Sequence, residues 1–338
     1  MTDYQNIPWN DIVEFGQETM LTGHLFTVSW ILARFCNYSC SYCWPYARSS
    51  TLDHQDLELY LHTLDSIKAQ ARANGFTDFH FSFSGGEPTA YKYFDKIIEH
   101  YACDHTANYQ SIHMTTNLSP GYKWWSKWLV DTKELHRRSI TASFHAEFAD
   151  EQKFGDKCLR LLDSDVFLTI NQVMVPEQFD ELYERLERFS NRGINVTLKP
   201  QSDPTASFVV NGYTPQQINI MQTGFPQQWQ GKHLSQVELT DNLKNKYYVD
   251  QAERFNSFGF NKFKGWSCNA GYQGIVIREN EVKRSYSCCD IPLGTLDKGF
   301  KIFKEPKNCI TETCVSSADS KIPKRIDIYK KSGKFYVS

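Results

Sequence analysis

The sequence lacks three features that would each assign it to a broad class of proteins. No apolar run approaches the roughly 20 residues of a membrane-spanning helix, so we expect no membrane association. The start of the chain, with Asp3, Asn6, Asp11 and Glu14, has neither the basic beginning nor the apolar core of a secretory signal peptide. It also has no block of basic residues, and 37 Lys and Arg nearly balance 39 Asp and Glu. Nucleic acid and anionic membrane surfaces are therefore not expected partners, and a small or neutral substrate is.

The chain does contain ten cysteines. Without a signal segment, they argue against the disulfide framework of a secreted protein. A reducing cytoplasm, which keeps thiols free for metal, is the expected location. The length of 338 residues exceeds the usual size of one domain, so we expect a main domain and a smaller one.

Three of the cysteines, Cys36, Cys40 and Cys43, follow a strand-like apolar run at 26–35. Cysteine thiolates hold iron–sulfur clusters, and a cubane bound entirely by protein needs four of them. Three thiolates at this spacing would leave one iron open for a ligand that is not protein. A zinc site accepts similar spacings and is the alternative.

A glycine-rich turn follows the next predicted strand, at 79–84. The turn reads Gly85-Gly86-Glu87-Pro88, in which the two glycines let the backbone approach a ligand closely. Glu87 offers a carboxylate to an ammonium group. A Gly-Gly pair alone is also typical of an ordinary turn. This pair lies one strand and one helix after the cysteine motif, and that position favours a ligand-binding turn.

Together the two motifs resemble those of the radical S-adenosylmethionine (SAM) enzymes. That family has a C-x3-C-x2-C motif with an aromatic residue before the last cysteine, here Tyr42, and a GGEP motif, here Gly85 to Pro88. The resemblance implies that the three cysteines hold a [4Fe–4S] cluster whose open iron is chelated by SAM. Gly85, Gly86 and Glu87 would bind the amino group of SAM. The resemblance also implies an electron donor such as flavodoxin or ferredoxin, and reductive cleavage of SAM to a 5′-deoxyadenosyl radical that abstracts hydrogen from the substrate.

Strand-like and helix-like segments alternate between residues 26 and 200. The patterns predict strands near 26–35, 79–84, 111–116, 139–144, 166–174 and 194–199. They predict helices near 91–101, 122–133, 150–162 and 177–190, and an earlier helix marked by Leu57, Leu61, Leu64 and Ile67 with Asp53 as a nearby N-cap. Such alternation implies an α/β protein with a parallel sheet. The resemblance implies the particular form, a partial (β/α)6 TIM-like barrel.

Polar residues follow the predicted strands, at the carboxyl ends where the chemistry of such barrels takes place. These residues are Thr115, Thr116, Asn117, Ser143, His145, Lys199 and Gln201. Each one alone could be an ordinary hydrogen-bonding residue at a strand end, but their common rim favours a site. By analogy with the family, Thr115, Asn117 and Ser143 are expected near SAM.

Half of the cysteines form a second cluster near the C-terminus: Cys268, Cys288, Cys289, Cys309 and Cys314. Two strand-like runs between the first two predict a hairpin with Asn280 at its turn. The stretch 266–318 resembles the twitch extension of radical SAM enzymes, a small α+β domain in which a hairpin and a short helix hold an auxiliary [4Fe–4S] cluster.

This second resemblance has two departures. Asn280 stands where a glycine is expected, although Asn tolerates the left-handed conformation that such a turn can need. Cys288 and Cys289 are two candidates for one ligand position. Five candidates for four positions favour a fully protein-bound cluster, and hence electron transfer rather than substrate binding. A zinc knuckle is the alternative, since four thiolates also bind zinc well.

These features divide the sequence into an N-terminal arm (1–25), a radical SAM barrel (26–200), a connector or lid (201–265), a twitch domain (266–318) and a C-terminal tail (319–338). Three functions are open: oxidation or cyclisation of a small molecule, maturation of a ribosomal peptide, and non-catalytic binding of zinc or iron. The 25 residues before the first predicted strand are fewer than an extra peptide-binding domain needs, so a small-molecule substrate is expected.

Overall fold

The computed structural model describes residues 6–43, 48–204, 209–226, 237–249, 259–288 and 291–326. The chain divides into two compact units. The unit that we call the parallel unit comprises Trp30–Leu61 and His80–Gln230. The antiparallel unit comprises Met1–Ser29, His62–Phe79 and Gly231–Ser338. No helix among the described residues is long and apolar enough to cross a membrane.

A sheet of parallel strands backed by helices forms the parallel unit. Its strands follow the order β2 (Leu25–Ile31), β3 (Asp78–Ser84), β4 (Tyr109–Thr116), β5 (Arg137–Ser143), β6 (Phe167–Met174) and β7 (Asn195–Pro200), of which β2 and β3 begin in the other unit. The pairs from β4 to β7 are parallel. The helices between the strands are α2 (Leu57–Ala73), which belongs to the antiparallel unit from His62 onward, α3 (Phe94–Ala102), α4 (Tyr122–Asp131), α5 (Glu151–Leu162) and α6 (Phe179–Asn191).

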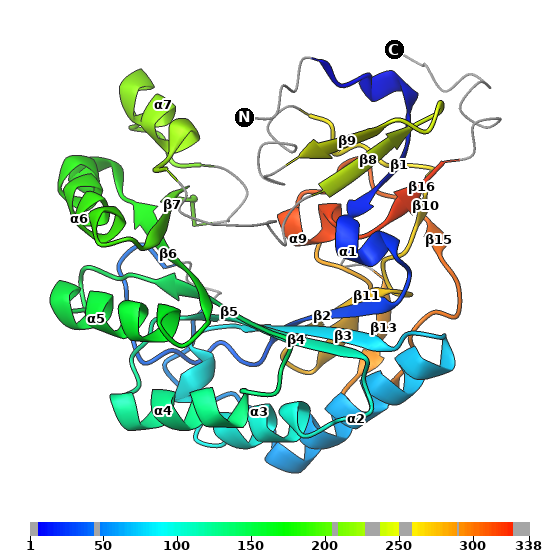
Figure 1. Ribbon diagram of the computed structural model, residues 1–338, viewed down its shortest axis with the longest axis horizontal. Helices are drawn as coiled ribbons and strands as arrows, with labels where there is room; N and C mark the ends of the chain where they lie inside the picture. The colour runs from blue at the N-terminus through cyan, green and yellow to red at the C-terminus, as the bar shows by residue number, and fades with distance from the viewer. Residues whose placement is uncertain are drawn as a thin grey trace. The chain divides into compact units, whose positions relative to one another are not determined.

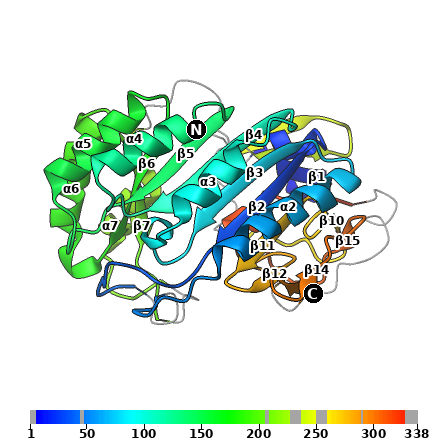
Figure 2. The same ribbon diagram turned by 90° about the horizontal axis from the view of Figure 1, so that it is seen from below.

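The predicted order of six strands and five helices is confirmed. Figures 1 and 2 show α3 to α6 along one face of this sheet, and β7 forms its edge, so the described strands make an open, partial barrel. The α/β class with a parallel sheet is confirmed with it. A further helix, α7 (Pro215–Thr223), follows β7 and begins with a capping box formed by Thr214 and Gln217.

The two faces of this sheet differ in polarity because side chains alternate along a strand. Phe81 and Phe83 are fully buried toward the helices, with ring contacts to Tyr101 and Phe94 of α3 at 4.8 and 5.6 Å between centroids. Burying each such ring contributes about 1.5–3 kcal/mol relative to leaving it exposed. On the other face, His113 of β4 shares a 2.9 Å hydrogen bond with the Ser139 hydroxyl of β5. The helices therefore cover the apolar face, and the opposite face carries polar side chains.

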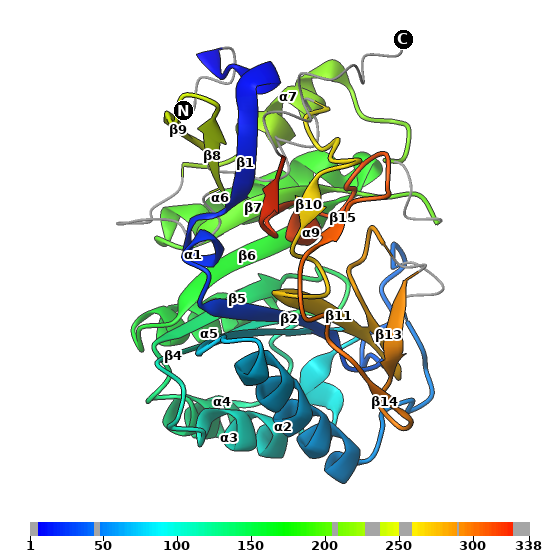
Figure 3. The same ribbon diagram turned by 90° about the vertical axis from the view of Figure 1, so that its right-hand side faces the viewer.

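The antiparallel unit contains two sets of paired strands. One follows the order β15 (Lys307–Asn308), β10 (Ser267–Cys268), β16 (Lys324–Arg325), β1 (Ile12–Gln17), β8 (Val237–Asp241) and β9 (Lys246–Val249) (Figure 3). The other is a meander of β11 (Gly274–Arg278), β12 (Glu281–Lys283), β13 (Pro292–Thr295) and β14 (Gly299–Phe300). Two short helices, α1 (Glu18–Leu21) and α9 (Ser317–Ser320), complete the unit.

One sheet thus joins three segments that the sequence had suggested to be an arm, a connector and a tail. β1 pairs with β8 on one side and with β16 on the other, both antiparallel. The hairpin predicted around residue 280 is present as β11 and β12. Its left-handed residue is Glu279, with φ of 57°, and not Asn280. The Asn280 side chain instead donates a 2.8 Å hydrogen bond to Asp297.

Candidate functional site

The cysteine motif lies in the loop that follows β2, and the backbone before it is fixed by the chain at the end of β3. Leu32 donates its N–H to the carbonyl of Ser84 at 3.0 Å, and Gly86 donates its N–H to the carbonyl of Ala33, also at 3.0 Å. Glu87 then donates to the carbonyl of Phe35 at 2.9 Å. Parallel pairing therefore continues beyond both strands and reaches the residue before Cys36.

The two glycines of the second motif are needed for this close pairing. A Cβ on Gly86 would lie 2.1 Å from the carbonyl oxygen of Phe35, and one on Gly85 would lie 2.4 Å from that of Ala33. Gly85 also has φ of 142°, which favours glycine. The sequence predicted that these glycines let the backbone approach a ligand closely, and this stays a prediction. In the structure, they allow a close approach to the chain that leads into the cysteine loop.

Asp53 holds the same segment from its other side. Its carboxylate accepts hydrogen bonds from the backbone N–H groups of Arg34 (3.0 Å) and Phe35 (2.9 Å). Asp53 therefore does not act as the N-cap of α2, which begins at Leu57. Its contacts instead fix the turn between β2 and Cys36.

Glu87 is buried, with 2% of its surface exposed, and its carboxylate accepts four hydrogen bonds. Oε1 accepts from the N–H and hydroxyl of Thr89 (3.0 and 2.6 Å) and from the hydroxyl of Thr116 (2.7 Å). Oε2 accepts from the N–H of Asn117 at 2.6 Å. Burial raises the pKa of Glu87, and these hydrogen bonds oppose the rise. A carboxylate has about four acceptor positions, so an ammonium group that contacted it would have to replace a donor of the chain.

Asn117 connects Glu87 to the cysteine loop. Its side-chain amide donates to the Asn37 side chain at 2.9 Å, while its backbone is held by Glu87. Thr115 and Ser143 are half-buried at the ends of β4 and β5. Within the described ranges, no hydrogen bond joins either of them to the cysteine loop.

The loop after β5 binds the other end of the cysteine motif. The Tyr42 hydroxyl and Nδ1 of His145 are 2.8 Å apart, and Ser41 donates its N–H and its hydroxyl to the carboxylate of Glu147 (3.0 and 2.6 Å). Burial lowers the pKa of His145 to about 4, so its ring is neutral near pH 7. Nδ1 can then accept a hydrogen bond from the Tyr42 hydroxyl. Tyr38 stacks on Phe148 with 5.0 Å between ring centroids. Glu147 had not been expected at this site.

The three thiols of this loop lie in surroundings that favour their neutral form. Burial raises the pKa of Cys36 and Cys43, and that of Cys40 to about 12, while Arg48 opposes the rise at Cys36 and Cys43. Metal binding removes these protons. Across the described ranges, no three Cys, His, Asp or Glu side chains converge to hold a single metal ion. A cubane cluster does not need such convergence, because each thiolate binds a different iron.

The antiparallel unit gathers four of the five C-terminal cysteines. Cys268 pairs with Lys307 on β15 and with Lys324 on β16. Cys309 donates its N–H to Trp266 at 2.7 Å, and Sγ of Cys314 lies 3.7 Å from the Ser287 hydroxyl, next to Cys288. These four cysteines have at most 7% of their surface exposed. Cys289 lies outside the described residues.

The electrostatics of this second cluster link its members. Burial raises the pKa of Cys314 to about 11, with a contribution from Cys268, and Lys324 opposes the rise. Burial also raises the pKa of Cys288, with a contribution from Cys309, and Arg284 opposes it. Four buried thiols with cationic neighbours are a donor set whose chemistry suits an iron–sulfur cluster, in which each thiolate binds a different iron.

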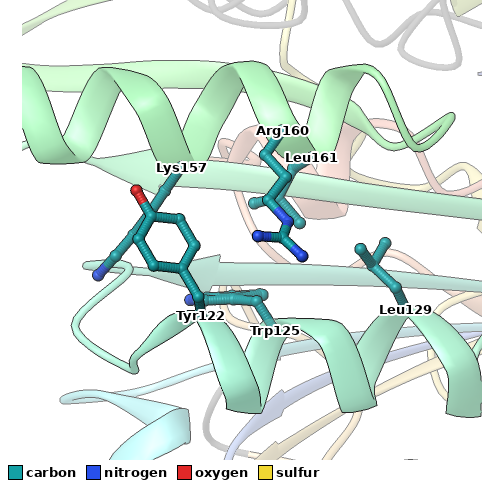
Figure 4. A pocket seen from close by; sticks show the side chains of 6 residues that line it. All are labelled: Tyr122, Trp125, Leu129, Lys157, Arg160 and Leu161. Atoms are coloured by element: carbon teal, nitrogen blue, oxygen red, sulfur yellow. The ribbon is translucent and has the colours of Figure 1, made fainter.

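A shallow surface hollow lies on the helical face of the parallel unit. It is lined by Tyr122, Trp125 and Leu129 of α4 and by Lys157, Arg160 and Leu161 of α5 (Figure 4). The Arg160 guanidinium lies 5.4 Å from the Tyr122 ring centre. None of the predicted site residues lines this hollow.

These observations define a partial α/β barrel with three thiols in the loop after its first strand, held by a glycine turn after its second. A family model described as the radical SAM superfamily matches residues 30–200. The chain belongs to the radical SAM superfamily, whose members are enzymes that use SAM and a [4Fe–4S] cluster. No curated protein matches the sequence.

Solved structures with a similar fold include native anSMEcpe with bound AdoMet (SAM) and the Kp18Cys peptide, with a TM-score of 0.51 and 14% identity over 82% of this chain and 79% of that one. A hexahistidine-tagged form of anSMEcpe with bound AdoMet gives the same values. BtrN in complex with AdoMet and 2-DOIA has a TM-score of 0.33 and 16% identity, over 59% of this chain and 82% of that one. The first two support the fold assigned to the chain.

Proposed function

We propose that this protein is a radical SAM enzyme that abstracts hydrogen from a small molecule and oxidises or cyclises it. Cys36, Cys40 and Cys43 would hold the SAM-binding [4Fe–4S] cluster. Cys268, Cys288, Cys309 and Cys314 would hold an auxiliary [4Fe–4S] cluster. The observation that supports the radical SAM part of the proposal is the hydrogen-bonded pairing of the glycine turn with the chain entering the cysteine loop, at Gly86 to Ala33 and Glu87 to Phe35.

The residues of the first site divide into ligands and supports. The three cysteines are the ligands, and when the cluster is bound and reduced it supplies the electron that cleaves SAM to methionine and a 5′-deoxyadenosyl radical. Glu87 would orient Asn117, and Asn117 would hold Asn37 within the loop, from the bonds at 2.6 and 2.9 Å. Thr115 and Ser143, at the same strand ends, would line the SAM site. Tyr42 would be held in place by His145.

The auxiliary cluster is proposed from the four buried cysteines of the antiparallel unit. Strand pairing places Cys268 beside the β15 segment that precedes Cys309, and Ser287 connects the Cys288 segment to Cys314. Four protein ligands leave no open iron for a substrate. Such a cluster would transfer electrons rather than bind substrate, and would take up one electron when the substrate radical left by hydrogen abstraction also loses a proton.

A ribosomal or other peptide is the second candidate substrate, since one structure of similar fold contains a bound peptide. The two substrates can be separated by measuring which fraction of a cell extract, peptides or small metabolites, stimulates SAM cleavage. Stimulation by the peptide fraction alone would overturn the small-molecule proposal. It would leave the cluster assignments in place.

Iron and sulfide analysis after anaerobic reconstitution tests the cluster assignments. We expect about eight irons and eight sulfides per chain, four of each per cubane. Replacing Cys36, Cys40 and Cys43 together with Ala should halve both and abolish release of 5′-deoxyadenosine with a strong reductant. Cys103→Ala is the matched control, because Cys103 is an exposed cysteine outside both groups, and it should lose no iron. Full iron content in the triple variant would refute the first assignment.

A further inference from the structure

Arg284 is a buried cation without a buried anion. It has 2% of its surface exposed and follows β12. Its guanidinium donates to three backbone carbonyls, those of Ala270 (3.0 Å), Lys307 (3.0 Å) and Asn308 (3.2 Å). No carboxylate of the described residues forms an ion pair with it. A buried charge without a counter-charge is costly, even when all its hydrogen bonds are made.

The three carbonyls belong to the segments that carry the proposed auxiliary ligands. Ala270 lies two residues after Cys268, and Asn308 immediately precedes Cys309. Arg284 itself lies four residues before Cys288. One guanidinium therefore joins three chain segments that contribute three of the four cysteines.

Lys324, a second buried cation near the C-terminal cysteines, has different surroundings. Lys324 also donates to three carbonyls, those of Asp319 (2.7 Å), Ile322 (2.8 Å) and Ser320 (3.4 Å). However, the carboxylate of Asp319 is buried as well, and Lys324 interacts with it electrostatically. Lys324 thus has a fixed anion in its neighbourhood, whereas Arg284 forms no ion pair among the described residues and interacts electrostatically with the Cys288 thiol.

We propose that Arg284 is a positioning residue and the fixed counter-charge of the auxiliary cluster, a proposal that rests on the proposed function. Four thiolates and the cluster they bind carry a net negative charge, which the guanidinium would compensate. A nearby positive charge stabilises the reduced, more negative state and so raises the reduction potential. Arg284 would thereby make the auxiliary cluster a better electron acceptor. It would also favour loading of the cluster, since the bound cluster would supply the negative charge that compensates the buried guanidinium.

The test uses the full-length chain in which Cys36, Cys40 and Cys43 are replaced by Ala, so that the auxiliary cluster alone is observed. In this background, Arg284→Gln removes the charge, and Arg284→Lys keeps it while changing the hydrogen bonds. Arg278→Gln is the matched control, because Arg278 lies on the same hairpin with its side chain 43% exposed. Iron content and the midpoint potential, from an anaerobic redox titration followed by electron paramagnetic resonance, are measured for each.

We expect about four irons in the parent, in Arg284→Lys and in Arg278→Gln, as for one cubane. Arg284→Gln should either lose iron or have a midpoint potential lower by at least the equivalent of a tenfold change in the reduction equilibrium, about 59 mV for one electron. An unchanged potential with full iron in Arg284→Gln would overturn the proposal, and so would equal losses of iron in the Gln and Lys variants. No iron in the parent would refute the auxiliary cluster itself, whatever Arg284 does.

Discussion

The backbone N–H of Glu87 donates a 2.9 Å hydrogen bond to the carbonyl of Phe35, the residue immediately before Cys36. This bond joins the two motifs on which the family resemblance depends. Helix α2 and strand β3 separate the motifs in the sequence, yet the end of β3 fixes the backbone from which the cysteine loop starts. The glycine turn therefore supports the cysteines even before any ligand is considered.

Gly86→Ala should disrupt this support. The new Cβ would lie 2.1 Å from the Phe35 carbonyl and 2.3 Å from that of Arg34, so two backbone segments would have to separate. Overpacking of this kind costs about 1–3 kcal/mol. We expect a lower free energy of unfolding in urea for the metal-free protein and a lower iron content after reconstitution.

Gly121→Ala is the control for that substitution. Gly121 has φ of −71°, and a Cβ there would meet nothing within 4 Å. Because Gly121 is the N-cap of α4, the change to Ala costs about 0.5–1 kcal/mol at most. Equal losses of stability and iron in the two variants would contradict the role given to Gly86.

Glu87→Gln should destabilise the protein through Asn117 or Thr116. The amide nitrogen of Gln takes the place of one carboxylate oxygen and donates where that oxygen accepted. Oε1 accepts from Thr116 and Oε2 from Asn117, so one of these donors loses its acceptor in either orientation of the amide. A buried donor left without an acceptor costs about 1–3 kcal/mol. We also expect weaker SAM binding, measured by equilibrium dialysis.

Thr116→Val distinguishes support from direct contact in that experiment. It removes one donor to Glu87 and leaves the carboxylate in place. If Glu87 acts by holding its neighbours, both variants should weaken SAM binding. A loss in Glu87→Gln alone would instead indicate that the carboxylate contacts the SAM amino group directly.

The sequence predicted the parallel unit well, because its signals are local. Alternating apolar residues marked β3 at 79–84 against the observed Asp78–Ser84, and β6 at 166–174 against Phe167–Met174. The sheet containing β1, β8 and β16 could not be predicted in this way. Its strands are short, and β1 pairs with β8 and β16 across more than 200 residues of sequence, so no periodic pattern reveals them.

Site residues that act through tertiary contacts were predicted less completely. His145 was recognised only as a polar residue at a strand end, while Glu147, 106 residues after Ser41, carried no signal of its contact. Arg284 looks like an ordinary charged residue after a hairpin strand, and its burial becomes evident only when β15 packs beside it.

The contact between Tyr42 and His145 should be measurable by a double-mutant cycle. Tyr42→Phe removes the hydroxyl, and His145→Phe removes Nδ1 while keeping a ring in place. For one hydrogen bond, we expect a coupling free energy of about 0.5–1.5 kcal/mol in urea unfolding of the metal-free protein. The cycle of Tyr38→Phe with His145→Phe serves as control, since Tyr38 meets His145 only edge to face, and it should give a coupling near zero. Equal couplings in both cycles would refute the hydrogen bond.

The choice between Cys288 and Cys289 should be visible in the metal content. The Cys288 side chain is buried and interacts electrostatically with Cys309, so Cys288→Ala should reduce the iron from about eight per chain to about four. Cys289→Ala should keep all of it. If product formation is assayed, Cys288→Ala should abolish it but leave uncoupled cleavage of SAM largely intact, because the first cluster alone drives that cleavage. Iron loss in Cys289→Ala instead would make Cys289 the ligand in place of Cys288.

About one zinc and four irons in the unsubstituted protein would replace the auxiliary cluster by a zinc knuckle, since four thiolates bind either metal.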